Sequence, residues 1–427
     1  MFSKSSIKYY LEQEPKFDDI MCSLEATARQ PKAMIKEAKE VIALARQFND
    51  EVVRPNALQL DRKVQENPDY LPRDIVEKAN EWGLYTMWIP RIFGGRGYSL
   101  ATFSFFIEEI ASACTAISNL IGTHYLGVGT LISTWNARII KKVLNEVVQG
   151  EKTGKPCLIS LALTEPDAGT DAEEIALMDK GTITCHAKRV DGGYLINGTK
   201  VFISNAHIST WHMLFSYADL SKPSESLVML AVKNGMEGFS SGRIERKMGQ
   251  KGCPAGELIF NNCFVPDEYV CIDPDQSKKL KRTPGQSTMQ IIDYIFGVSR
   301  AGVCAFGTGV ARGAYELALD FASKTQVEGK LLINHEWAQS MLTKMYKNVQ
   351  ISRLAYVESN YANGMYGLFK LLQMKPVFYI MKYLPDFLIN RVLNAVLDSR
   401  PYSNLGTRLL RKFHCDHQTD EEIGVPD

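Results

Sequence analysis

The chain of 427 residues lacks an excess of charge of either sign, a paired cysteine motif and a long apolar run. Its 49 lysines and arginines nearly balance its 48 aspartates and glutamates, so no global field would attract a nucleic acid or an anionic membrane. The nine cysteines are scattered, without a CxxC pair or a tight cluster. We therefore expect no nucleic-acid partner and no metal site, and we interpret the cysteines as buried thiols in a reducing compartment.

No stretch reaches the roughly 18 apolar residues that a membrane span needs, and the first residues lack the apolar run of a signal peptide. The hydrophobic fraction of 45% and the charged fraction of 23% are those of an ordinary globular protein. We expect a soluble cytoplasmic chain with two to three packing units, about what its length suggests.

The spacing of apolar residues predicts an α+β fold in successive parts. Residues 1–31 are expected to be an N-terminal extension. Residues 32–155 are expected to form an all-α domain, because apolar positions recur every three or four residues from about Lys32 to Asn136. Residues 156–275, rich in short β-branched and aromatic runs, are expected to form a small central β-sheet or barrel domain. Within it, Asn197-Gly198 predicts a tight hairpin turn.

Helical periodicity returns in residues 286–362, which are expected to be a partial C-terminal helical domain. Its long first helix carries many small residues, among them Gly302, Ala305, Gly307 and Gly309, which indicate either tight helix packing or contact with a ligand. Residues 363–427 are expected to be an amphipathic helical tail. This tail either faces a partner or the core, or touches a membrane surface through residues 366–413, where basic side chains lie among large apolar ones.

Three ordered motifs carry the functional signal. LALTEPDAGTD spans residues 161–171, GYLINGTKVFISNA spans residues 193–206, and KMGQKGCPAGELIFNNCFVP spans residues 247–266. Together with the order of helices, small sheet and helices, they resemble the acyl-CoA dehydrogenase family. The resemblance implies an FAD-dependent oxidation of an acyl-CoA thioester to the α,β-enoyl-CoA, in which a hydride passes from Cβ to the flavin N5.

The implied reaction has clear chemical needs. A weakly acidic Cα proton must leave while a hydride departs from Cβ, so the site requires a carboxylate base, hydrogen bonds to the thioester carbonyl and a redox cofactor. Side chains alone cannot accept the hydride.

The resemblance assigns roles to nine residues. The cofactor-binding set is Leu161, Leu163, Thr164, Gly169, Thr170, Phe202 and Ser204, and the substrate-binding set is Thr170, Phe296 and Arg300. In this assignment Phe202 packs on the isoalloxazine, Thr164 lines its pyrimidine side and Ser204 hydrogen-bonds near N5. From the residues alone, Phe202 is equally compatible with a strand core, and Arg300 with a structural ion pair.

The sequence also departs from the family pattern. Thr325 and Glu328 stand where the family carries an arginine and a phenylalanine that reach a neighbouring subunit's flavin, and Glu336 replaces a glutamine. Ser299 occupies the position where some members place the catalytic base. The usual alternative base, a carboxylate in a YEGT-like loop of the family's last helices, has no counterpart in this sequence, so the catalytic base stays unassigned.

These departures lead to three hypotheses. In the first, the chain is part of a heteromeric enzyme whose second acyl-CoA dehydrogenase-like chain supplies the last helices and the base. In the second, it is a non-catalytic docking subunit. In the third, it is a complete enzyme with an unrecognised base, for which Asp293, Glu336 and Glu358 are candidates. An enoyl-CoA reductase running in the opposite direction is a further alternative, and electron-transferring flavoprotein is the implied electron acceptor.

Overall fold

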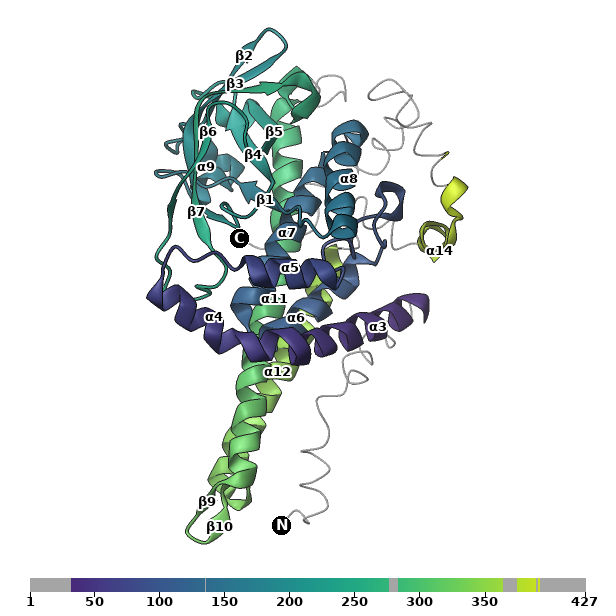
Figure 1. The fold of residues 1–427 in the computed structure, drawn as a ribbon, viewed down its shortest axis with the longest axis vertical. Coiled ribbons are helices and arrows are strands. Elements are labelled where there is room, and N and C mark those ends of the chain that lie inside the picture. The colour runs from purple at the N-terminus through teal and green to yellow at the C-terminus, as the bar shows by residue number, and fades with distance from the viewer. Residues whose placement is uncertain (1–31, 135, 276–282, 364–374, 389–390, 392–427) are drawn as a thin grey trace. The chain divides into compact units, whose positions relative to one another are not determined.

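The computed structural model describes residues 32–134, 136–275, 283–363, 375–388 and 391 (Figure 1). The predicted N-terminal extension and most of the predicted tail lie outside the described residues. The described residues fall into two compact units: unit 1 comprises those of 32–58, 99–118 and 300–363, and unit 2 comprises those of 59–98, 119–299 and 375–391. Helices precede and follow a central sheet, which confirms the predicted α+β fold.

Unit 2 contains an eight-stranded sheet in which the order of strands is β6-β7-β3-β2-β4-β5-β8, while β1 pairs in parallel with β4. Its buried core consists of apolar residues from most of these strands. The strands are β1 (Ile159–Ala162), β2 (His186–Val190), β3 (Gly193–Ser204), β4 (Trp211–Tyr217), β5 (Leu227–Lys233), β6 (Phe239–Ile244), β7 (Ala255–Pro266) and β8 (Val270–Ile272).

The predicted hairpin at Asn197-Gly198 is wrong, because β3 continues through both residues. Gly198 instead marks a β-bulge, where the pairing of β3 with β7 shifts register. A Cβ at this glycine would lie 2.7 Å from the backbone of Cys185. The close approach of these two backbone segments therefore requires glycine at position 198. The tight turn is Asp191-Gly192, the two-residue loop between β2 and β3, where Gly192 has a φ of 74°.

Several helices lie wholly or partly in unit 2, and one of them, α7, is packed through buried polar groups. His124 on α7 accepts the backbone N–H of Ile159 at Nδ1 (3.2 Å) and lies 3.0 Å from the carbonyl of Tyr85 through Nε2. Asn205, just after β3, donates to the Leu120 carbonyl of α7. The helices are α4 (Arg54–Glu66), α5 (Arg73–Glu81), α7 (Thr115–Ser133), α8 (Ala137–Thr153), α9 (Ile175–Met178), α11 (Pro284–Lys324) and α14 (Lys375–Tyr383).

The main helices of unit 1 are α3 (Lys32–Phe48), α6 (Phe103–Ala113), the part of α11 from Arg300 onward, and α12 (Glu336–Asn363). A short hairpin of β9 (Gln326–Val327) and β10 (Lys330–Leu331) joins α11 to α12, which run side by side (Figure 1). Thr308 and Ser352 link the two helices, with their hydroxyls 2.6 Å apart. A π-helical turn, Asn49–Val53, follows α3.

Two glycines of α11 pack closely against α6, and two others face open space. A Cβ at Gly309 would lie 2.5 Å from the Glu108 carbonyl oxygen, and one at Gly313 would lie 2.2 Å from the Ser112 carbonyl oxygen. These two glycines therefore allow α11 to pack against the backbone of α6. A Cβ at Gly302 or Gly307 would meet no atom within 4 Å, so the packing explanation holds for only part of the helix.

A buried charge cluster holds α6, α11 and α12 together. Arg353 donates to both carboxylate oxygens of Glu108, at 2.6 and 3.0 Å, and Arg312 makes a bidentate contact with Glu109. Tyr356 donates its hydroxyl to Glu108 at 2.6 Å. Burial alone would raise the pKa of the Glu108 carboxyl, but its hydrogen bonds and charge pairing with the two arginines hold that pKa below its ordinary value.

Within the described part of the chain, α11 is the one helix long and apolar enough to cross a bilayer by length and composition. A single such helix is weak evidence, since the core helix of a water-soluble protein passes the same test. The structure gives no disulfide among the seven described cysteines, and burial raises the pKa of Cys185 and Cys253 to about 11.

Candidate functional site

The end of β1 and the C-terminal part of β3 lie against each other in unit 2. The Val201 N–H donates to the Thr164 carbonyl at 2.9 Å. At this point β3 is bulged, because its pairing with β7 shifts register between Lys200 and Ile203. The structure therefore brings together the first two sequence motifs, and Ser204 lies opposite Ala255 of the third.

Phe202 lies in this bulge with a φ of 58°, in the left-handed region that an aromatic residue rarely adopts. Its side chain is 58% exposed. The alternative in which Phe202 belongs to the strand core is therefore wrong, because the bulge turns the ring outward instead of following the inward alternation of the strand. Strained backbone conformations cluster at ligand and active sites, so Phe202 is a candidate for contact with a ligand.

The side-chain hydroxyls of Thr164 and Ser204 lie on either side of the bulge. Thr164 and Ser204 are both half-buried, and among the described residues neither side-chain oxygen has a hydrogen-bond partner. A half-buried hydroxyl can donate one hydrogen bond and accept others, so both are available to a bound polar group.

The remaining predicted cofactor residues of unit 2 differ in exposure. Leu161 is half-buried within β1, and Leu163 is buried just after it. Gly169 is half-buried and a Cβ there would meet no atom within 4 Å, while Thr170 is exposed. The Gly169 N–H donates to the Asp171 carboxylate at 2.7 Å, which fixes the loop between them.

The predicted substrate residues on α11 are divided between the two units. Phe296 is half-buried and Arg300 is exposed, one turn apart on the helix. The division between the two units falls between Ser299 and Arg300. Arg300 therefore belongs to unit 1, whereas the cofactor set and Phe296 belong to unit 2.

Sequence reasoning missed the ion pair of Glu165 and Lys200, which adjoins the site. The Lys200 ammonium lies 2.8 Å from the Glu165 carboxylate, and both side chains are buried. The signal was present in the sequence, since both residues lie inside the first two motifs, but a glutamate and a lysine 35 positions apart give no periodic pattern.

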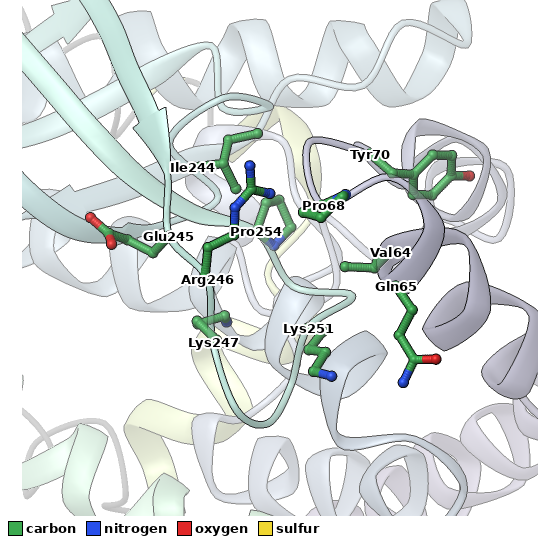
Figure 2. Close-up of a pocket in the computed structure, with 10 residues that line it drawn as sticks. All are labelled: Val64, Gln65, Pro68, Tyr70, Ile244, Glu245, Arg246, Lys247, Lys251 and Pro254. Carbon is green, nitrogen blue, oxygen red and sulfur yellow. The ribbon is translucent and has the colours of Figure 1, made fainter.

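A pocket of about 230 Å³ lies elsewhere in unit 2 and contains none of the predicted site residues (Figure 2). Apolar Val64, Pro68, Ile244 and Pro254 line it together with Gln65, Tyr70, Glu245, Arg246, Lys247 and Lys251. Two of its cations already have partners, because Arg246 pairs with the Asp69 carboxylate at 3.2 Å and Lys247 donates to the Cys253 carbonyl.

The three candidate bases, Asp293, Glu336 and Glu358, are all exposed. Glu328 also is exposed and forms, with Gly329, the positive-φ turn between β9 and β10. The described residues contain no group of three histidines, cysteines, aspartates or glutamates that could hold a metal ion.

Comparison with known proteins gives a consistent result along the chain. Models of the N-terminal, middle and C-terminal domains of acyl-CoA dehydrogenases match residues 35–151, 160–263 and 289–362. Benzylmalonyl-CoA dehydrogenase of Aromatoleum aromaticum is 30% identical over 306 residues, which cover 70% of this chain and 71% of that protein. The chain belongs to the acyl-CoA dehydrogenase family.

Two further similarities are informative. The 3-(aryl)acrylate reductase of Clostridium sporogenes is 27% identical over 327 residues, covering 74% of this chain and 77% of that protein. The structure of a glutaryl-CoA dehydrogenase from Mycobacterium smegmatis in complex with FADH2 has a TM-score of 0.60 at 17% identity, covering 88% of this chain and 89% of that one. The latter likeness shows the acyl-CoA dehydrogenase fold, whose helical, β-sheet and helical parts the chain shares in order.

Proposed function

We propose that this member of the acyl-CoA dehydrogenase family is an FAD-binding subunit of an enzyme that oxidises an acyl-CoA thioester to its α,β-enoyl-CoA. One observation carries the proposal. The β3 bulge turns Phe202 outward beside the end of β1, and the hydroxyls of Thr164 and Ser204 on either side have no hydrogen-bond partner in the part of the chain that the structure describes.

These residues fit a flavin chemically. The exposed Phe202 ring offers a face for the planar isoalloxazine, and offset packing of aromatic rings contributes about 0.5 to 1.5 kcal/mol beyond area burial. Thr164 and Ser204 supply hydroxyl donors for the polar edge of the ring system, and the open space at Gly169 leaves room beside them. When bound, FAD would accept the hydride, which no side chain can do.

The proposal is tested by FAD binding to the purified full-length chain. Thr164→Val and Ser204→Ala each remove one donor and leave a buried acceptor unpaired, so each should weaken FAD binding by about 1 to 3 kcal/mol, roughly 5- to 150-fold in Kd. Thr199→Val is the matched control, since Thr199 is also a half-buried residue of β3. No visible flavin absorption in the purified chain or its complex would favour the non-catalytic docking subunit.

We further infer that a second acyl-CoA dehydrogenase-like chain completes the site. The observation behind this is an apolar seam on α11 formed by exposed residues, namely Val303, Gly307, Val310, Ala314, Leu317 and Phe321. Their spacing alternates between four and three, which is the heptad pattern that packs against another helix. Exposed Glu328 and Glu336 would repel an anionic diphosphate, so we do not assign them to a flavin clamp of a second copy.

In this proposal the partner's helices cover the seam and its carboxylate removes the Cα proton. Turnover by the isolated chain, at the rate of the complex and with a full complement of FAD, would contradict it. The result would instead favour a complete enzyme, to be pursued through the amide variants of Asp293, Glu336 and Glu358. Electron-transferring flavoprotein is the proposed acceptor of the electrons.

The reverse reaction is the second candidate, because one relative is named a 3-(aryl)acrylate reductase. Both directions use the same flavin and the same CoA thioesters. They differ in whether a second protein or reagent accepts electrons from the flavin or donates electrons to it. Assays that offer an enoyl-CoA with a reductant, and an acyl-CoA with an oxidant, would distinguish them by which half-reaction changes the flavin absorption.

A further inference from the structure

A fully buried ion pair adjoins the proposed flavin site. The side chains of Lys200 and Glu165 are 0% and 1% exposed, and the ammonium lies 2.8 Å from the carboxylate. Replacing a buried ion pair by apolar residues often leaves stability unchanged or increases it, because the desolvation of two charges is expensive. Stability alone therefore gives no reason for placing two charges here.

The pair ties three segments of unit 2 to one another. Lys200 Nζ also donates to the Leu163 carbonyl at 2.7 Å, at the end of β1. The second oxygen of Glu165 accepts the N–H groups of Thr184 and Cys185, at 2.6 and 3.0 Å, and the Thr184 hydroxyl at 2.9 Å. Both charged groups are thus hydrogen-bonded, which fixes the end of β1, the middle of β3 and the segment before β2 in one arrangement.

The Lys200–Glu165 pair fixes the N-terminal end of the strained bulge. Lys200 is the residue at which the pairing of β3 with β7 begins to shift, and Phe202 follows two positions later with its φ of 58°. A residue in such a conformation costs about 1 to 3 kcal/mol and persists only where its surroundings over-determine it. On the other side, the Asn205 N–H donates to the Pro254 carbonyl at 2.7 Å.

We propose that Lys200 and Glu165 are positioning residues for the flavin site. They act through their neighbours, because the pair fixes Leu163 and Thr164 just after β1 and the Phe202 bulge in β3. The inference rests on the proposed function, since it assumes that the bulge receives a flavin. It goes beyond that function by making FAD affinity depend on two side chains that need not touch the cofactor.

Two variants separate positioning from stability. Lys200→Met alone leaves a buried carboxylate without its cation and should lower the free energy of unfolding. Adding Glu165→Gln removes the second charge while keeping an oxygen for the amides of Thr184 and Cys185. The double variant should recover most of the lost stability of the apo chain in urea unfolding. Its Kd for FAD should nevertheless stay at least about tenfold above that of the parent.

A buried polar pair on the neighbouring strands provides the matched control. The Ser160 hydroxyl of β1 lies 2.7 Å from His212 Nδ1 of β4, both side chains are buried, and among the described residues their hydrogen bonds do not reach the bulge. Ser160→Ala combined with His212→Asn should lower stability and leave the Kd for FAD unchanged. A rise in Kd for this control equal to that of the Lys200→Met/Glu165→Gln variant would overturn the positioning role, since it would reflect general loosening of the sheet.

The FAD affinities of the double variant and of the parent distinguish the positioning role from the proposed function. Parental FAD affinity in the double variant contradicts the positioning role alone, whereas a parent that binds no FAD contradicts the proposed function and the positioning role together. If the double variant does not fold, Thr184→Val carries the test, because it removes one hydrogen bond to the Glu165 carboxylate and leaves both charges paired. It should bind FAD more weakly and shift the visible flavin spectrum, and a parental Kd and spectrum would overturn the inference.

Discussion

Phe202 lowers the stability of the isolated fold but exposes its ring at the candidate site. Its left-handed backbone is unfavourable for an aromatic side chain, and its ring gains little from burial because more than half of it is exposed. Neither feature serves the isolated fold. Both are explained if the ring packs on a planar ligand, because the strain is then offset when the ligand binds.

Two buried histidines should make the fold sensitive to mild acid. Burial lowers the pKa of His124 and of His212 to about 4, from an ordinary value of 6.5. Since the folded pKa lies below the unfolded one, the unfolded chain binds more protons between these values, and stability falls as pH decreases from 6.5 towards 4. By pH 5 the loss should be about 2 kcal/mol for each histidine.

Urea unfolding between pH 7 and pH 5 measures this effect above the range in which carboxylates such as Glu108 titrate. His212→Asn keeps a neutral polar side chain, so it should lose less stability over this range than the parent does. His186→Asn is a suitable control, because His186 is only half-buried. An equal acid loss in the parent and in His212→Asn would show that His212 is not held neutral by burial.

At the scale of the element, α11 combines a tightly packed face with an open one, and its glycines should respond accordingly. Gly309→Ala and Gly313→Ala would place a methyl group against the α6 backbone, so each should destabilise by about 1 to 3 kcal/mol. Gly302→Ala and Gly307→Ala meet open space inside a helix, so each should stabilise by about 0.5 to 1 kcal/mol.

Denaturant midpoints of the four variants provide the measurement, and the open pair is the control for the packed pair. Stabilisation by all four substitutions would show that α11 does not pack on α6 through Gly309 and Gly313, and destabilisation by all four would show that Gly302 and Gly307 do not face open space. The contrast also explains why the sequence left packing and ligand contact open for this helix. A glycine in a helical pattern marks close approach only where a neighbouring backbone is present, and periodicity does not reveal the neighbour.

The central strand β3 shows the same limit of local patterns. Asp191-Gly192 and Asn197-Gly198 are both favourable turn dipeptides, and only the first forms a turn. The choice depends on β7, which pairs with β3 on both sides of Gly198 and requires a continuous strand. The existence and order of the elements followed from periodicity, whereas this register depended on a partner strand about 60 residues away.

For the whole molecule, the ordered motifs were sufficient to predict the fold and the family. They also placed Thr164, Phe202 and Ser204 in segments that the structure brings together. The interactions that hold those segments were not predictable, because Glu165 with Lys200 and Glu108 with Arg353 join residues far apart in sequence through buried charges. Such pairs leave no periodic signal and depend on desolvation in the finished fold.

The exposed seam of α11 leads to a prediction about assembly. Leu317 is 73% exposed and Val310 is 48% exposed, on the face of α11 that carries the heptad spacing. If helices of a partner chain pack there, Val310→Glu combined with Leu317→Glu would bury two charges at the interface and should dissociate the complex. The chain itself should keep its stability, because both residues are exposed in it.

Co-expression with an acyl-CoA dehydrogenase-like chain that carries the YEGT-like loop, followed by size-exclusion chromatography with light scattering, measures the assembly. Leu58→Glu is the matched control, since Leu58 is 74% exposed on α4 and lies outside the seam. The seam variant should elute as the free chain, while the control should elute with its partner. A seam variant that retains the partner as well as the control does would place the interface elsewhere. Loss of a mass equal to a second copy of this chain would instead identify the seam as a self-association surface.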